Sequence, residues 1–396
     1  QSPIPNPHLK NIKKLNKSYF HKLSYKICFI SFCFIINIYW LKRYGIREQI
    51  LLKGRKYLNR CLFGKLNRKV YSKFVNPSVT VIIPVYNCQN SIKQVIRSIQ
   101  NQKMIELEIL LVNDKSKDNS LKIIETLQKT DKRIRIINNK RNMGTLYSRS
   151  IGVLQAKGNY IFPLDNDDMF FDDDVCDFVY KEAYYFNYDI VGFIAIQAKS
   201  YKANINEMKI GCHMHNKNFT IYQPNLSLFG ISKKGKLKIN EVHIWSKCIK
   251  NSVYKKSVNL LGKKRYSFFL SWAEDTSMVF ALFNIANSYR YIIKYGIFRF
   301  NRKNSASESM PKSHKLFGEI YFLDVIFDFT KNDYKSKKFA VYKAINIRNG
   351  KYFKSLNKIN ANYLKLTMKK LFSCPYISNE DKNNLKFILD RKSTRL

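Results

Sequence analysis

Acidic residues are scarce in this chain of 396 residues, which has 28 Asp and Glu against 71 Lys and Arg and a formal net charge of +43. Such an excess ordinarily indicates a nucleic-acid partner or an anionic membrane surface. Nine of the acids, however, fall within residues 165–189. A nucleic-acid-binding face avoids this concentration because carboxylates repel phosphate. The excess is instead typical of the Lys- and Asn-rich composition of an AT-rich genome, and we expect no nucleic-acid partner.

Several binding motifs are missing. The eight cysteines form no C-x-x-C pair and no finger-like spacing with the six histidines, which argues against structural zinc, and their irregular spacing is not that of a disulfide scaffold. Neither the G-x-G-x-x-G fingerprint nor the P-loop pattern occurs. A phosphate-bearing ligand must therefore be neutralised in another way. Since 45% of the residues are hydrophobic, the chain can bury a core, and wholesale disorder is excluded.

The apolar run at 27–41 is short for a membrane span. Its 15 uncharged residues would form a helix about 22 Å long, less than the roughly 30 Å of the hydrocarbon core. A single-pass signal-anchor, an interfacial helix and a core helix all fit. We expect the anchor, and therefore a membrane-associated protein, in the Golgi or ER if the source is eukaryotic. Because six basic residues lie in 10–26 and six in 42–57, the orientation stays open.

Composition shifts divide the chain into segments. Residues past Pro311 keep roughly helical apolar spacing, and we expect them to pack on the core or touch a membrane. The tail DRKSTRL resembles one reading frame of a sequencing adapter, and we exclude it from the fold. The predicted organisation is a basic N-terminus with the candidate anchor (1–45), a basic stem or linker (46–77), a catalytic domain (78–310), a helical basic extension (311–389) and the adapter-like tail (390–396).

The segment 78–310 alternates strand and helix patterns. Short apolar runs are separated by stretches with helical periodicity, and these runs lie at 79–83, 107–112, 134–137 and 160–164. This repetition predicts an α/β fold with a mostly parallel, Rossmann-like sheet flanked by helices. In such sheets, ligands bind beyond the carboxyl ends of the strands.

Polar residues follow three of these predicted strands. They are Tyr86-Asn87, Asp114 and the string Asp165-Asn-Asp167-Asp168. Because the carboxyl ends of parallel strands share one edge, we expect these side chains in one crevice. Closely spaced carboxylates suit a hard divalent cation, Mn²⁺ or Mg²⁺, that bridges a diphosphate. In isolation the acidic string is more typical of a solvated turn, but its place after an apolar strand favours the metal.

The stretches 79–87, 111–120 and 141–168 resemble the nucleotide-binding half of family 2 glycosyltransferases, which adopt the GT-A fold. The resemblance implies that the donor nucleotide, usually uracil-containing, is bound by Pro84, Tyr86, Asn87 and Asp114. It implies a D-x-D motif in which Asp165 and Asp167 hold ribose and metal, with Asp168 as a further metal ligand. Of the family's R-N-x-G pattern, the Asn is lost and the arginine is kept as Arg149. The resemblance implies that Arg149 approaches phosphate. Asn113 stands where Asp is common, and Lys115 stands where Gly is common.

The acceptor half resembles the family through shorter elements. Residues 242–249 resemble a W-x-K element, Trp272-Ala-Glu-Asp275 resembles the E-D element, and 302–307, beginning at Arg302, resemble the segment that closes the domain. The family's acidic dipeptide supplies the general base. We expect Asp275 in that role rather than Glu274, with a helix cap as the alternative for Asp275.

Other candidate residues keep two interpretations each. Trp245 and Trp272 could stack on a sugar or pack in the core. Lys247 could neutralise a diphosphate or be solvated. His213 and His215 could add a metal ligand or lie in a surface loop.

The resemblance implies a metal-dependent inverting glycosyltransferase that moves one sugar from a nucleotide sugar, with UDP expected, to a hydroxyl acceptor on a glycan, glycolipid or glycoprotein. The Q-x-x-R-W element of processive synthases is absent. Two alternatives stay open. One is a polyprenyl-phosphate sugar transferase, and the other is an inactive scaffold that acts as a basic membrane- or nucleic-acid-binding protein.

Overall fold

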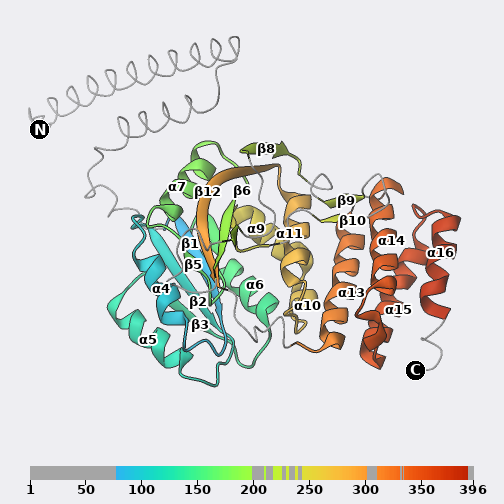
Figure 1. The fold of residues 1–396 in the computed structure, drawn as a ribbon, viewed down its shortest axis with the longest axis horizontal. Coiled ribbons are helices and arrows are strands. Elements are labelled where there is room, and N and C mark those ends of the chain that lie inside the picture. Colours follow the sequence, from blue (N-terminus) through green and yellow to red (C-terminus); the bar gives the residue numbers. More distant parts are fainter. Residues whose placement is uncertain are drawn as a thin grey trace, which may run out of the picture. The chain divides into compact units, whose positions relative to one another are not determined.

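The computed structural model describes residues 77–198, 209–210, 217–224, 229–231, 237–239, 243–300, 310–330, 332 and 334–390, which belong to one compact unit of the chain (Figure 1). Several predicted features lie outside the described residues: the candidate anchor at 27–41, most of the stem, His213, His215 and Arg302. Among the helices that are described, none is long and apolar enough to cross a membrane.

Four parallel strands form the half of the sheet that the sequence predicts. They lie in the order β3-β2-β1-β4 and are β1 (Val79–Val85), β2 (Leu107–Asn113), β3 (Ile134–Asn138) and β4 (Tyr160–Pro163). The helices between them are α4 (Ile92–Gln100), α5 (Ser120–Thr130) and α6 (Thr145–Gln155). Every residue of β1 is buried, as expected for a strand covered on both faces. The predicted parallel α/β arrangement is confirmed here.

Beyond β4 the sheet is mixed, which the strand patterns did not predict. β11 (Lys247–Lys250) runs antiparallel to both β4 and β6 (Ile190–Ala198), and β12 (Ser288–Phe300) lies parallel to β6. The shorter strands are β5 (Met169–Phe170), β7 (Lys209–Ile210) and β8 (Phe219–Tyr222) in the same sheet, and the separate pair β9 (Phe229–Ile231) and β10 (Leu237–Ile239).

Helices cover both faces of the sheet, and the side chains of β1 show how. Val81 and Ile83 pack in an apolar cluster with residues of α4, α5 and α7 (Val175–Tyr185). Ile82 points to the other face, into a cluster with residues of α6, α9 (Asn251–Leu261) and α11 (Glu274–Ile285). The short helix α10 (Lys263–Tyr266) follows α9. This alternation is the period of two expected for a strand.

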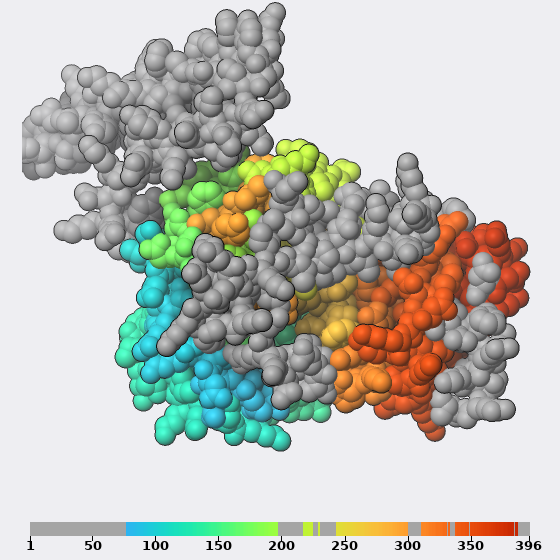
Figure 2. Space-filling model, in the orientation of Figure 1, coloured from blue at the N-terminus to red at the C-terminus, as the bar shows by residue number. Residues whose placement is uncertain are grey.

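The helices past Pro311 extend the second cluster. They are α13 (Lys312–Phe329), α14 (Tyr334–Asn349), the 3-10 turn η2 (Phe353–Ser355), α15 (Lys358–Ser373) and α16 (Asn379–Asp390). The ring of Phe280 in α11 lies 5.8 Å from that of Phe322 in α13 and 5.9 Å from that of Phe339 in α14. Figure 2 shows the orange and red atoms of these helices directly against the yellow atoms of the preceding ones. The helices past Pro311 therefore pack on the α/β domain that precedes them.

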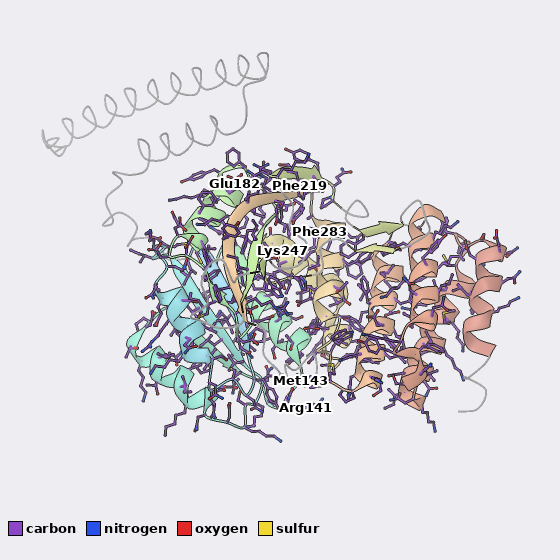
Figure 3. All side chains as sticks on the ribbon, viewed as in Figure 1. Arg141, Met143, Glu182, Phe219, Lys247 and Phe283 are labelled. Carbon is purple, nitrogen blue, oxygen red and sulfur yellow. The ribbon has the colours of Figure 1, made fainter. Side chains whose placement is uncertain are left out.

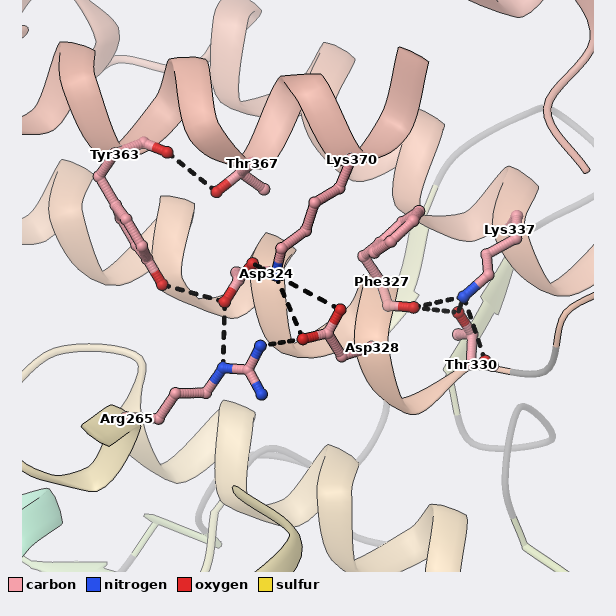
Figure 4. Close-up of polar contacts among 9 residues, drawn as sticks. All are labelled: Arg265, Asp324, Phe327, Asp328, Thr330, Lys337, Tyr363, Thr367 and Lys370. Atoms are coloured by element: carbon pink, nitrogen blue, oxygen red, sulfur yellow. Dashed lines mark hydrogen bonds and ion pairs between the residues drawn. The ribbon is translucent and has the colours of Figure 1, made fainter. Parts of the chain in front are cut away.

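A cluster of charged side chains joins α13 to its neighbours (Figure 4). The buried carboxylate of Asp324 accepts hydrogen bonds from Arg265 Nε at 3.1 Å, Tyr363 Oη at 3.2 Å and Lys370 Nζ at 2.6 Å. Asp328, one turn further along α13, accepts from Arg265 and from Lys370. Because three donors on α10 and α15 converge on Asp324, this carboxylate ties the C-terminal helices to the preceding domain.

We expect Asp324→Asn to lower the free energy of unfolding by about 3 kcal/mol, because Arg265 and Lys370 lose the buried carboxylate and keep the more exposed Asp328 as counter-charge. The matched control is Asp177→Asn on α7. Asp177 pairs with Lys181 four residues on, and both side chains are more than a third exposed, so the expected loss is less than about 0.5 kcal/mol. Urea unfolding of both variants measures the difference, and equal losses would contradict the role given to Asp324.

Candidate active site

The carboxylate of Asp114, immediately after β2, holds the loop that leads into α6. Its Oδ1 accepts from Asn139 Nδ2 and from the Met143 backbone N–H, and its Oδ2 accepts from the Gly144 N–H, each at 2.8 Å. Figure 3 shows Arg141 and Met143 on this loop, beside the start of α6. Asp114 itself is 3% exposed. The predicted nucleotide contact thus also shapes the loop between β3 and α6.

The turn after β1 is fastened to the turn after β2. The Lys117 N–H donates to Asn87 Oδ1 at 2.8 Å, and the Asn87 N–H donates to Ser116 Oγ at 3.3 Å. Tyr86, next to Asn87, is 38% exposed. Lys115 has a φ of 60°, in the left-handed region that favours glycine, which explains why Gly is common at this position in the family that the chain resembles. Both predicted nucleotide-binding turns therefore form one connected edge.

Arg149 joins two carboxylates that are distant in sequence. The residue lies on α6 and is 2% exposed. Its Nη2 donates to Asp165 Oδ1 at 2.8 Å, and its Nη1 donates to Asp275 Oδ1 at 2.7 Å. Asp165 follows β4, whereas Asp275 lies in the first turn of α11. The structure thus brings the predicted donor side and the predicted base together through one guanidinium.

Burial and neighbouring charges shift several pKa values here. Burial raises the pKa of Asp165, although Arg149 opposes the shift. Burial first, and then the charge of Asp275, raises the pKa of Glu274 to about 8. The carboxyl of Glu274 is therefore protonated at neutral pH in the ligand-free protein. The carboxylates of Asp165 and Asp275 raise the pKa of Arg149, so this residue stays charged.

The helix-cap interpretation of Asp275 is not supported. The N-cap of α11 is Ala273, with a φ of 58°, and Asp275 is the second residue of the helix. No side chain forms the cap hydrogen bond of α11. A non-glycine residue in this conformation stores backbone strain, which is frequent at functional sites.

Part of the chain is similar to a known protein family. Residues 80–246 match the family described as Glycosyl transferase family 2. This stretch, which is less than half of the chain, therefore resembles the domain of that family. An uncharacterized glycosyltransferase of Haemophilus influenzae is 43% identical over 93 residues, and a GalNAc(5)-diNAcBac-PP-undecaprenol beta-1,3-glucosyltransferase of Campylobacter jejuni is 37% identical over 93 residues. These matches cover 24% and 23% of the chain, and 29% and 30% of the two relatives.

A solved structure extends the likeness of the fold beyond this domain. The crystal structure of Staphylococcus aureus TarS residues 1–349 in complex with UDP-GlcNAc has a TM-score of 0.56 and 14% sequence identity. The superposition covers 78% of this chain and 83% of that one. The predicted GT-A fold is confirmed by this likeness.

Two of the predicted acceptor-side residues, Trp245 and Lys247, are almost completely buried, whereas Trp272 is half-buried. Trp245 is 4% exposed and stacks on His243 with ring centroids 4.6 Å apart. Lys247 is 1% exposed, and its Nζ donates to the His243 carbonyl oxygen at 2.6 Å. Trp272 packs edge-on against Tyr352 at 6.1 Å. Core packing is therefore the better description of Trp245 in the ligand-free protein.

Sequence reasoning missed two residues near the crevice. The guanidinium of Arg299 on β12 lies 5.4 Å from the ring centroid of Trp245 and lowers the pKa of Asp165, partly offsetting burial. Tyr254 on α9 is fully buried, and its hydroxyl has no hydrogen-bond partner. Its neighbours Val258 and Leu261 share its helical spacing, so the sequence indicated only a core position. Arg299 belongs to no motif that could have identified it.

The acidic residues after β4 fit a divalent cation whose remaining ligands are oxygen atoms of the substrate. Asp167 and Asp168 offer only hard oxygen donors, and one or two carboxylates with phosphate oxygens are typical of Mg²⁺ sites. Asp165 is engaged by Arg149. Across the residues the structure describes, no group of three or more His, Cys, Asp or Glu side chains could hold a metal ion by itself. The donor set therefore suits a metal shared with a diphosphate.

The raised pKa of Glu274 predicts a dependence of stability on pH. The unfolded chain releases this proton near the ordinary pKa of 4.5, whereas the folded protein keeps it up to about pH 8. The free energy of unfolding should therefore fall as the pH rises from about 5 to 8. Glu274→Gln should flatten that fall, measured by urea unfolding across this range. Glu125→Gln, an exposed change on α5, should leave the dependence of the free energy of unfolding on pH unchanged. If Glu274→Gln shows the same dependence as the parent protein, the assignment is wrong.

Proposed function

We propose that the protein is a metal-dependent inverting glycosyltransferase that moves one sugar from a nucleotide sugar, with UDP as the expected nucleotide, to a hydroxyl acceptor. The observation that carries this proposal is the pair of hydrogen bonds from Arg149 to Asp165 and to Asp275. They bring the acid after β4 and the acid of the E-D element within hydrogen-bond distance of the same guanidinium. A donor held at Asp165 would then lie beside a carboxylate that can accept a proton.

The chain's own residues supply most of the chemistry in this proposal. The turn at Tyr86 and Asn87 holds the base of the donor at the edge shared with β2. Asp167 and Asp168 would hold Mn²⁺ or Mg²⁺, which neutralises charge on the leaving diphosphate when bound. Asp275 takes the proton of the acceptor hydroxyl, whose oxygen attacks the anomeric carbon as the bond to the diphosphate breaks. Arg149 orients Asp275 toward this step.

Two of the compared proteins support the donor class. TarS is described in complex with UDP-GlcNAc, and the relative from C. jejuni is named as a glucosyltransferase acting on an undecaprenol-linked glycan. A nucleotide sugar is therefore proposed for this chain too, and the acceptor is a glycan, lipid-linked or protein-linked. Membrane association through 27–41 is part of the same proposal. The chain matches less than a third of those two curated relatives, so its activity rests on the site geometry.

The test of this function is a screen of nucleotide sugars for hydrolysis or transfer in the presence of Mn²⁺ or Mg²⁺. We expect release of the nucleoside diphosphate from at least one UDP-sugar, and loss of that release on adding a chelator. Salt-sensitive binding of bulk nucleic acid with no turnover of any donor would favour the inactive-scaffold alternative instead.

We expect Asp167→Ala to abolish metal-stimulated turnover, because the substrate oxygens and the metal lose one of their two protein carboxylates. Circular dichroism and the melting temperature should stay close to those of the parent protein. Asp173→Ala serves as the control, since this nearby acid forms an exposed pair with Lys103. If the metal dependence of Asp167→Ala equals that of the parent, the metal assignment is wrong.

We expect Asp275→Asn to reduce the turnover rate by about 100-fold to 10,000-fold, because an amide keeps the shape of the side chain but cannot take a proton. Glu274→Gln should have a smaller effect, since Glu274 is already protonated at neutral pH. Steady-state kinetics on both variants compare the two acids directly. A variant Asp275→Asn that transfers sugar at the parent rate, together with an inactive Glu274→Gln, would transfer the role to Glu274.

A further inference from the structure

The loop that leads into the E-D element is held from two sides. It covers 267–273, between α10 and α11. On one side, the carbonyl oxygen of Leu270 accepts from the Leu146 N–H at the start of α6, at 3.3 Å. A Cβ on Gly144 would lie 3.1 Å from Leu270 N, so the backbones at Gly144 and Leu270 pass in close contact. The first anchor of the loop therefore belongs to the stretch that matches family 2.

The second anchor lies outside that stretch, on α13. A Cβ placed on Gly318 would lie 2.2 Å from the carbonyl oxygen of Trp272 and 3.0 Å from its carbonyl carbon. The first distance is shorter than any that real Cβ atoms show and the second is unusually tight, and both atoms belong to the backbone and cannot rotate away. Gly318 is therefore the residue that lets α13 touch the loop directly.

The indole of Trp272 fixes the same contact from another direction. Its ring packs edge-on against Tyr352, with centroids 6.1 Å apart, and Lys315 Nζ lies 5.0 Å from its centroid. Both partners belong to the C-terminal helical region. Trp272 therefore rests on α13 through its backbone and on the segment after α14 through its side chain.

Only Ala273 separates Trp272 from the acidic dipeptide. Ala273 is the left-handed N-cap of α11, with a φ of 58°, so its conformation leaves little freedom to absorb a shift. Displacement at Trp272 therefore passes to Glu274 and Asp275. Because Asp275 Oδ1 lies 2.7 Å from Arg149 Nη1, such displacement would also alter the link to Asp165.

We infer that Gly318 is a positioning residue, through which α13 holds Asp275 in its place opposite Arg149. This inference rests on the proposed function, in which Asp275 takes part in turnover. It gives the C-terminal helices a role in the reaction, although they supply no residue to the crevice among those described.

The experiment is Gly318→Ala in the full chain. The added methyl group must push the Trp272 backbone, so we expect kcat to fall by about 10-fold to 100-fold, the range that a misplaced catalytic group produces. The KM for the donor and the affinity for UDP should change less than kcat, because the turns proposed to hold the base follow β1 and β2, and among the proposed donor contacts Asp165 is the one linked to Asp275 through Arg149. Tyr352→Ala, which removes the aromatic partner of Trp272 without adding volume, should lower kcat in the same direction.

The matched control is Leu323→Ala on the same helix. Leu323 is fully buried, so this change should lower the melting temperature through a cavity. It should leave the kcat of the folded protein unchanged, because position 323 lies about 140° around α13 from Gly318. Measuring kcat at a temperature at which all variants are folded separates a displacement of Asp275 from a loss of stability.

A readout independent of activity separates this inference from the proposed function. The chain has three tryptophans, and replacing Trp40 and Trp245 with Phe leaves Trp272 as the single emitter. In that background, Gly318→Ala should shift the emission to longer wavelength and raise quenching by acrylamide. If the parent protein turns over no donor, the proposed function fails while the emission still tests the contact.

Two results would overturn the inference. One is a folded Gly318→Ala variant with parental kcat and unchanged Trp272 emission. The other is a variant that loses UDP affinity while kcat is kept, since this would place its effect on the donor half. If Gly318→Ala does not fold, Tyr352→Ala decides, and a parental kcat in that variant counts against the inference.

Discussion

The buried guanidinium of Arg149 is the constraint on which the rest of the site depends. A charge that is 2% exposed is tolerated only where opposite charges compensate the loss of water. Asp165 and Asp275 provide that compensation, and each must approach within hydrogen-bond distance to do so. The turn after β4 and the first turn of α11 are therefore held toward α6 by the same requirement. Removal of either carboxylate would leave the cation undercompensated as well as remove a functional group.

This requirement explains why the E-D loop needs support on both sides. Electrostatic attraction to Arg149 draws Asp275 inward, but it does not set how closely α11 approaches α6. Packing sets that distance, through the contact of Leu270 with Gly144 and that of Trp272 with Gly318. The Phe280 contacts with α13 and α14 then fix the axis of α11. Attraction and steric contact together leave the carboxylate one position.

Sequence patterns predicted the parts of this site that are local and missed those that depend on contacts between distant segments. The apolar run 79–83 and the acids at 165–168 gave the strand, its end and the candidate crevice. The ion pair of Arg149 with Asp275 spans 126 residues, and no spacing rule reaches that far. The same holds for the antiparallel strand β11 and for Arg299.

One departure from the family pattern after β2, at position 113, is held by a contact with a neighbouring strand. At position 113, Asn stands where Asp is common, and its side chain has two different partners. Its Oδ1 accepts from the Ser116 N–H at 3.1 Å, and its Nδ2 donates to Asn138 Oδ1 at 2.9 Å. A carboxylate could make the first bond but not the second, because it has no proton to donate. Asn113 is 2% exposed, so the lost partner could not be replaced by bulk water. Asn113 is therefore matched to Asn138 on the next strand, and the exchange of Asp for Asn keeps the turn that positions Asp114.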